Sequence, residues 1–347
     1  MSSEYANKQE KKYLRDIPFS VLDLAPVVAG STPADALRNT LDIAQHAEKW
    51  GYNRFWVAEH HNMKGIASSA TSVVIGHVAG GTSKIRVGSG GIMLPNHAPL
   101  VIAEQFGTLE SLYPGRIDLG LGRAPGSDQL TAHALRRDIR SHGEDFPQLL
   151  HELRTYFNPA LSQEKMYVRA VPGEGLNIPV WLLGSSTFSA QLAGMLGLPF
   201  AFASHFSPNN TLPALNAYRR SFRPSEVLDK PYALVCLNVI AAETDEKAER
   251  LATSLQQQFL NLIRNKPGLL QPPVDSMEHI WTPYEKAALE QQLGSTIIGS
   301  KETVENMLQA FLDETQADEM MVTAQIFDHF DRLRSFEIVS EIAGNKQ

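Results

Sequence analysis

The chain has 347 residues, a length that suits either two average domains or one α/β barrel with insertions. Its hydrophobic share of 43% and charged share of 20% are those of an ordinary globular protein, not a disordered, fibrous or membrane protein. A net charge of −7 argues against nucleic acid as a partner. No run approaches the roughly 20 apolar residues of a membrane span. We therefore expect a cytoplasmic protein with no membrane or nucleic-acid partner.

Residues 1–16 are charged and polar and lack the apolar core of a signal peptide. We expect a flexible N-terminal extension there. No shift in composition marks a domain boundary in the remainder, so residues 17–347 are predicted to form a single domain.

From Pro18 onward, short apolar runs alternate with longer amphipathic stretches, the pattern of βαβ units. Strands are predicted over residues 19–24, 54–58, 85–88, 117–121, 180–183, 200–203, 233–241 and 319–323. Helices are predicted over residues 33–50, 69–79, 99–112, 146–156, 189–196, 213–221, 245–264, 301–314 and 329–343. Eight such units either close into a barrel or form an open doubly wound sheet. The count favours an α/β fold of the (β/α)8 TIM-barrel type.

Three connections are longer than usual: residues 124–145, 158–177 and 267–295. Connections of that length commonly act as lids or binding segments. We expect them to be insertion loops at the C-terminal face of the barrel.

Active sites of such barrels lie at the C-terminal ends of the strands. The second predicted strand ends in Glu59, His60 and His61. A single histidine there is more often structural, but two beside a carboxylate favour a functional role. Successive side chains of a strand point in opposite directions, so only one of the two histidines is expected to face the barrel mouth. The cluster fits proton exchange with a ligand and a metal site equally well.

The third predicted strand ends in Gly88, and Gly90 and Gly91 come just after it. Missing side chains there would admit a flat ligand close to the backbone, and a β-bulge explains the segment equally well.

Arg123 follows the fourth strand, and Gly184, Ser185, Ser186 and Ser189 follow the fifth, at the start of a helix. A guanidinium, hydroxyls and helix N-terminal N–H groups together form an anion-binding cradle. Taken singly, each serine is most simply a helix cap. The chain contains no Gly-Lys-Ser or Gly-Lys-Thr of a Walker A loop. We therefore expect a phosphate site of another kind.

Five runs, residues 56–62, 88–95, 103–109, 115–123 and 184–190, resemble the bacterial-luciferase-like flavin monooxygenases, and among them the YhbW-type branch. The resemblance extends from Pro18 to about Ala343. It implies a (β/α)8 barrel that binds FMN in the reduced form (FMNH2), supplied by a separate flavin reductase. It also implies that the reduced flavin reacts with O2 to oxygenate a small organic substrate, and that the enzyme is a homodimer.

Position by position, the resemblance makes His60 the active-site histidine, supported by His61 and Glu59. It puts a non-proline cis peptide at Gly90–Gly91 under the flavin ring. Cofactor binding is also implied for the remaining cradle residues, Arg123, Gly184, Ser185, Ser186 and Ser189, with the phosphate held by the arginine and serines.

Two further expectations follow from the same comparison. Gly122 stands where light-emitting members carry a reactive cysteine, so light emission is not expected. Residues 267–295, with Trp281 and Tyr284, fall where the family has a mobile lid.

Other functions stay open at this point. One is an F420- or FMN-dependent oxidoreductase without oxygenation, and another is a non-catalytic flavin-binding protein. A metal-dependent hydrolase using His60, His61 and His205 ranks behind both, because the first strand lacks the His-x-His with which such sites often begin. No metal is expected. Leu24, Phe206 and the lid aromatics favour a largely apolar substrate.

Overall fold

The computed structural model describes residues 11–124, 129–135, 144–162 and 168–344. Residues 1–10 of the predicted extension, and parts of the predicted loops 124–145 and 158–177, lie outside the described residues. The described end of the extension contains the 3-10 helix η1 (Leu14–Asp16), and Lys12 Nζ lies 2.7 Å from Asp318 Oδ1. Flexibility of the extension stays a prediction.

Eight parallel strands close into a barrel, which confirms the predicted fold. They are β1 (Phe19–Asp23), β2 (Arg54–Val57), β3 (Arg86–Ser89), β5 (Ile117–Gly122), β6 (Val180–Gly184), β7 (Phe200–Ala203), β8 (Ala233–Ala242) and β10 (Glu319–Thr323). β10 pairs with β1 on one side and β8 on the other, so the ring has no open edge. All eight agree with the predicted strands to within one residue at each end.

Two further strands extend the sheet and were not predicted. β4 (Ile92–Met93) pairs with β5, and β9 (Ile297–Ser300) pairs with the C-terminal half of β8. β4 spans two residues, too few for a hydrophobic pattern to stand out, and β9 spans four between the expected loop 267–295 and the expected helix 301–314.

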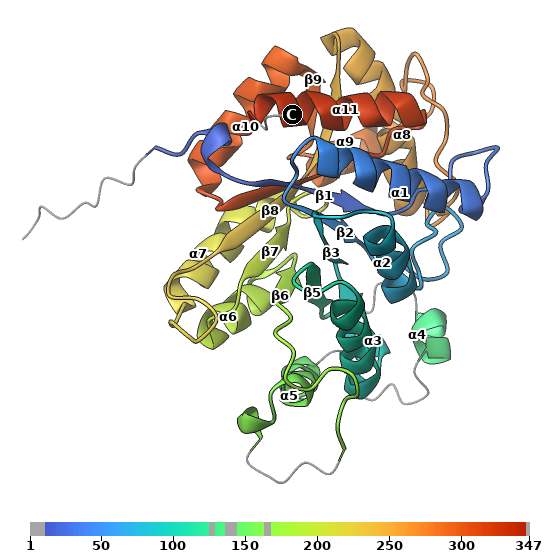
Figure 1. Ribbon diagram of the computed structural model, residues 1–347. Coiled ribbons are helices and arrows are strands. Elements are labelled where there is room, and N and C mark those ends of the chain that lie inside the picture. The colour runs from blue at the N-terminus through green and yellow to red at the C-terminus, as the bar shows by residue number, and fades with distance from the viewer. Residues whose placement is uncertain (1–10, 125–128, 136–143, 163–167, 345–347) are drawn as a thin grey trace, which may run out of the picture.

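Figure 1 shows the helices arranged around the strands. They are α1 (Pro33–Lys49), α2 (Thr71–Gly80), α3 (Pro99–Leu112), α4 (Gln129–Leu135), α5 (Phe146–Phe157), α6 (Thr187–Leu196), α7 (Thr211–Ser221), α8 (Asp245–Ile263), α9 (Pro283–Gln292), α10 (Lys301–Thr315) and α11 (His329–Ile342). Short 3-10 helices lie at η2 (Leu94–Asn96), η3 (Pro159–Leu161) and η4 (Pro208–Asn210). Within the described ranges, no helix is both long and apolar enough to cross a membrane.

Local sequence explains where these helices begin. The Thr32 side chain accepts the Asp35 N–H at 3.2 Å, and Pro33 occupies the first turn of α1. α9 begins in the same way inside the expected lid, because Thr282 caps it and Glu285 completes the capping box.

The interior of the barrel has its own apolar cluster, distinct from the larger one under the helices. Trp56 of β2 and Trp181 of β6 meet edge to face, with ring centroids 5.2 Å apart. At the N-terminal end of the barrel, Arg54 bonds to Glu319 and Asp118, and Asp118 also accepts the Trp56 Nε1–H. Side chains therefore fill the lower barrel, and space for a ligand remains at the C-terminal ends of the strands.

Candidate active site

A cavity of about 400 Å³ opens at the C-terminal ends of the strands. Much of its wall is apolar, with Leu24, Ile66 and Phe259 among the lining residues. Arg123 is the one charged residue among the described residues that line it. A second hollow lies between α6 and α7 on the outside of the barrel, away from every predicted site residue. The first cavity is therefore the candidate active site.

His60 lines this cavity, and its buried Nδ1 has no hydrogen-bond partner. Burial lowers the pKa of His60, although the neighbouring Glu59 carboxylate opposes the change. The imidazole is therefore neutral at pH 7 and free to donate or accept a hydrogen bond. His61 is directed to Glu59 instead, with Nε2 2.8 Å from Oε1. As expected, only one of the two histidines faces the barrel mouth, although both lie beyond the end of β2.

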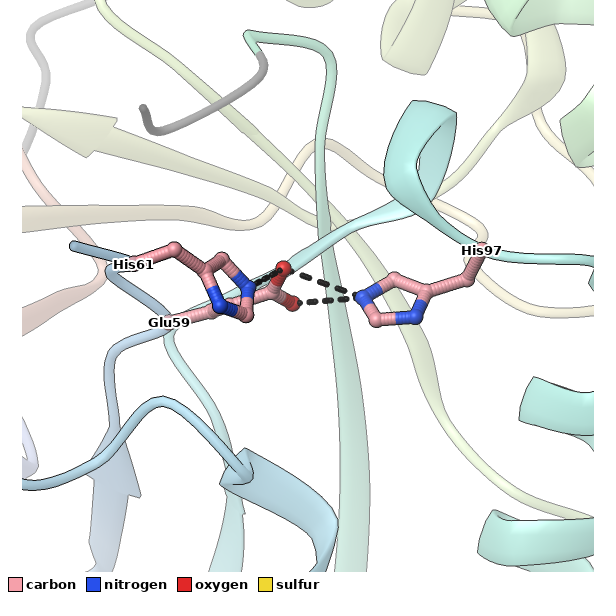
Figure 2. Close-up of side chains that lie close together, drawn as sticks. All are labelled: Glu59, His61 and His97. Atoms are coloured by element: carbon pink, nitrogen blue, oxygen red, sulfur yellow. Dashed lines mark hydrogen bonds and ion pairs between the residues drawn. The ribbon is translucent and has the colours of Figure 1, made fainter. Parts of the chain in front are cut away.

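Glu59, the residue before His60, is the centre of a compact polar network with His61 and His97 (Figure 2). Its carboxylate is 1% exposed and accepts the Met93 backbone N–H at 2.9 Å and the Asn96 side-chain amide at 3.2 Å. His61 and His97 approach it from two sides, and His97 Nε2 lies 3.0 Å from each carboxylate oxygen. Although burial disfavours ionisation, the His97 and Met93 hydrogen bonds hold the Glu59 pKa below its usual value.

The same three side chains raise the question of a metal. Ligand atoms of Glu59, His61 and His97 lie within 4.8 Å of one another. Both imidazoles, however, hydrogen-bond directly to the carboxylate, an arrangement that is complete without an ion. The three histidines that the sequence offered as a metal site do not come together. His60 and His205 line the cavity, whereas His61 is directed to Glu59. His97, 38 residues beyond Glu59, was missed by the sequence analysis.

The peptide bond between Gly90 and Gly91 is cis. A Cβ on Gly90 would lie 2.6 Å from Leu22 Cδ1, and one on Gly91 would lie 2.8 Å from the Gly120 carbonyl oxygen. Strand pairing stops at Ser89 and resumes at β4, so the segment is a break between strands. Gly90 presents bare backbone to the cavity, which leaves room for a flat ligand.

The five predicted cradle residues, Arg123, Gly184, Ser185, Ser186 and Ser189, all line the cavity. The Arg123 guanidinium lies 4.4 Å from the centroid of the Phe188 ring. Ser186 is the N-cap of α6, but its side chain makes no capping hydrogen bond. The helix-cap explanation therefore does not account for Ser186, and the hydroxyl is available to a ligand.

Gly122 lies beside this cradle at the end of β5. A Cβ there would lie 2.5 Å from Met93 Sδ, so a larger residue fits only if the methionine moves.

The expected apolar wall is confirmed for Leu24 and Phe206 and is wrong for the aromatic residues of the lid. Tyr284 is 82% exposed, and Trp281 packs against the main core. The Thr282 cap starts α9 just before Tyr284, and the first turn of that helix leaves the tyrosine ring in solvent. The lid contributes Gln292 to the wall instead.

Polar residues on the opposite side of the cavity were also missed. Asn238, Gln258, Thr323 and Gln325 line it from β8, α8 and the end of β10. The available signal for Thr323 and Gln325 was their position at the end of the last predicted strand, where Thr323 is the final residue and Gln325 follows two residues later.

Comparison with known proteins agrees with this geometry. The family model described as luciferase-like monooxygenase matches residues 17–319. A luciferase-like monooxygenase of Escherichia coli (strain K12) is 55% identical over 328 residues, covering 94% of this chain and 97% of the relative. The crystal structure of apo-MsnO8 superposes with a TM-score of 0.88 at 36% identity, covering 95% of this chain and 99% of that one.

Two solved structures of lower identity share the fold. The oxygenating constituent of 3,6-diketocamphane monooxygenase from Pseudomonas putida, in complex with FMN, gives a TM-score of 0.72 at 17% identity, covering 95% of this chain and 99% of its own. An F420-dependent secondary alcohol dehydrogenase gives 0.66 at 15% identity, covering 94% of this chain and 99% of its own. The family match covers most of the chain and includes the ends of β1 to β8 that line the cavity, but it stops before the end of β10. The chain therefore belongs to the luciferase-like monooxygenase family.

Proposed function

We propose that the chain is the oxygenating component of a two-component flavin monooxygenase, which uses FMNH2 from a separate reductase, together with O2, to oxygenate a small organic substrate. The observation that carries the proposal is the joint placement on one cavity of Arg123, the start of α6 and the bare Gly90 backbone. They suit a phosphate and a planar ring attached to it. When bound, reduced FMN supplies the electrons that activate O2.

In this proposal Arg123 binds the flavin phosphate, with Ser185, Ser186 and Ser189 as hydrogen-bond donors beside it. Gly184 lets Ser189 lie close to the end of β6, because a Cβ at position 184 would lie 2.9 Å from the Ser189 Cβ. Gly90 and Gly91 support the ring.

His60 is the proposed catalytic residue, and its unpartnered Nδ1 supports a hydrogen bond to cofactor or substrate. Glu59 and His61 are positioning residues. Through the Met93 N–H, Glu59 ties the end of β2 to the segment that follows Gly91. The Glu59 network would thereby hold in place the part of the cavity wall that contacts the flavin ring.

Replacement of Arg123 by alanine tests the phosphate assignment. A charge-assisted hydrogen bond contributes about 1.5–3 kcal/mol, so FMNH2 should bind roughly 10- to 100-fold more weakly. Arg220→Ala is the control, since Arg220 is exposed on α7 outside the cavity. Unchanged FMNH2 affinity in Arg123→Ala would contradict the assignment.

A matching experiment addresses the histidine. His60→Ala should retain FMNH2 binding but release more peroxide per O2 consumed, because the neutral imidazole is lost from the cavity. An unchanged rate of flavin oxidation and an unchanged peroxide yield would exclude His60 from the reaction. NADH or NADPH alone should not reduce FMN on this chain, which would separate it from a self-sufficient reductase.

The nearest rival function is hydride transfer with F420 or FMN and no oxygenation. We consider this rival because an F420-dependent secondary alcohol dehydrogenase shares the fold. Anaerobic turnover with reduced F420 would favour the rival, whereas strict dependence on O2 favours the monooxygenase. A third candidate, flavin storage, predicts binding without substrate-dependent O2 consumption.

A homodimer is part of the proposal. Apolar side chains are exposed on neighbouring helices, with Val73 of α2 at 71%, Val101 of α3 at 44% and Leu112 of α3 at 63%. Exposed apolar side chains on neighbouring helices are candidates for a two-fold interface. Sedimentation should give a dimer, and Val73→Glu with Leu112→Glu should give a folded monomer. A monomeric wild type would contradict the assignment.

Residues 267–295 are the proposed cover of the cavity. Leu270 is buried and pairs with the segment after β1, where its carbonyl accepts the Ala29 N–H at 2.8 Å. Gln292 reaches the cavity wall. A closed cover keeps water from the reduced cofactor. Hydrogen exchange in this segment should slow when FMNH2 binds, and unchanged exchange would argue against a lid.

A further inference from the structure

The half of the cavity away from the phosphate cradle carries several polar groups without partners. Buried atoms with no hydrogen-bond partner include His205 Nδ1, Thr323 Oγ1, Gln258 Oε1 and both amide atoms of Gln325. All four residues line the cavity. Each unsatisfied buried group costs about 1–3 kcal/mol, so a cluster of them on one wall indicates that a ligand completes their hydrogen bonds.

Barrel order separates Thr323 and Gln325 from the cradle, whereas His205 follows β7, the neighbour of β6. The cradle lies at the ends of β5 and β6, and Gly90 follows β3, the next strand in the ring. Thr323 and Gln325 belong to the end of β10, which lies between β8 and β1, on the opposite side of the ring. A ligand that uses Gln325 therefore occupies a different part of the cavity from a phosphate held by Arg123.

The polar cluster carries no charge. Burial, with a smaller contribution from His60, lowers the pKa of His205 to about 4, so its imidazole is neutral at pH 7. Thr323, Gln258 and Gln325 are uncharged side chains. Among the described residues that line the cavity, the only cation is Arg123, on the other side. Binding a carboxylate here would bury a charge with no compensating cation, which is strongly unfavourable.

A glutamine amide offers one carbonyl acceptor and two N–H donors within a single plane. Its best partner is a group with the same pair of functions, such as a carboxamide. Beside the cluster lie apolar side chains from α8, Phe259 and Leu262, and Leu24 from the end of β1. They suit the hydrocarbon part of the same molecule.

We infer that the β8–β10 half of the cavity is the substrate subsite, and that it selects an uncharged molecule with an amide group bound by Gln325 and an apolar remainder. The inference rests on the proposed function for the assignment of this ligand as substrate. Gln325 is then a specificity-determining residue.

The first arm of the test measures binding of two ligands of equal chain length, hexanamide and hexanoate, by calorimetry at pH 7.5. The wild type should bind hexanamide at least about tenfold more tightly. Gln325→Leu should lose about tenfold in hexanamide affinity, and Gln291→Leu, on the exposed side of α9, should lose none. Equal affinity of the wild type for the two ligands, or an unaltered hexanamide affinity in Gln325→Leu, would overturn the inference.

The second arm needs no ligand. Removal of an unsatisfied buried amide by an apolar side chain of similar size is neutral or stabilising, so Gln325→Leu should keep or raise the melting temperature. A clear fall would mean that the amide has a structural role and would overturn the inference.

A third arm separates the substrate from the cofactor. FMNH2 affinity should be the same in Gln325→Leu and the wild type, and a parallel loss would assign Gln325 to the flavin and overturn the inference. If FMNH2 binds but the amide preference is absent, only the inference fails. If FMNH2 does not bind, the proposed function fails, while the ligand series remains measurable because it requires no flavin.

Discussion

The buried ion cluster at the N-terminal end of the barrel gives a quantitative prediction. Arg54 Nε lies 2.8 Å from Glu319 Oε1, and its Nη1 lies 2.7 Å from Asp118 Oδ2. Both carboxylates are 0% exposed. Replacement of Arg54 by methionine keeps much of the side-chain volume and removes the central cation. Glu319 is then left with neutral partners, including the Ser20 and Tyr232 hydroxyls, whereas Asp118 keeps Arg86.

The expected loss follows from the burial. Removal of one partner from a buried ion pair costs about 3–5 kcal/mol, because the remaining charge is uncompensated. We expect Arg54→Met to lose that much in free energy of unfolding, measured by urea denaturation at pH 8. Arg38→Met is the matched control, since Arg38 and its partner Asp35 are 68% and 40% exposed. An exposed pair of this kind contributes at most about 1 kcal/mol.

A loss below about 1 kcal/mol at pH 8, no larger than that of the Arg38→Met control, would refute the argument.

Three other predictions concern the site. Glu59→Gln should lower the free energy of unfolding by about 1–3 kcal/mol in urea denaturation, because His97 loses a charged, buried acceptor. His205 is neutral when folded, and its pKa falls from 6.5 to about 4, so the unfolded state binds more protons between those values. Wild-type stability should therefore fall as the pH is lowered from 6.5 to 4, and less so in His205→Gln. Gly120→Ala should fold poorly by circular dichroism, since its Cβ would lie 2.1 Å from the Ser89 carbonyl oxygen.

The barrel was predictable because its strands are continuous apolar runs between clear helix signals. Such runs are expected where both faces of a parallel sheet are buried, as they are here. Helix α9 was hidden inside a segment expected to be a loop, although its Thr282–Glu285 capping box was visible in the sequence. Strand β4 has two residues and depends on its pairing with β5, which sequence periodicity does not report.

The site was predictable where chemistry is local. His60 next to Glu59, and Arg123 near the start of a helix, stand out because neighbouring residues combine. His97 and Gln325 could not be assigned in that way. His97 meets Glu59 only after the segment following Gly91 folds back, and Gln325 reaches the cavity only when β10 closes the ring between β8 and β1. The roles of His97 and Gln325 depend on contacts between residues far apart in the sequence, which a local pattern does not report.

The central claim is that the cavity binds reduced FMN and presents it to O2. We would titrate the chain anaerobically with FMNH2 and then mix the complex with O2 while recording the flavin absorbance. Saturable binding, followed by oxidised FMN that returns more slowly than from free FMNH2, is the predicted result. If FMNH2 does not bind, or oxidises at the rate of the free cofactor, the account of this site is contradicted.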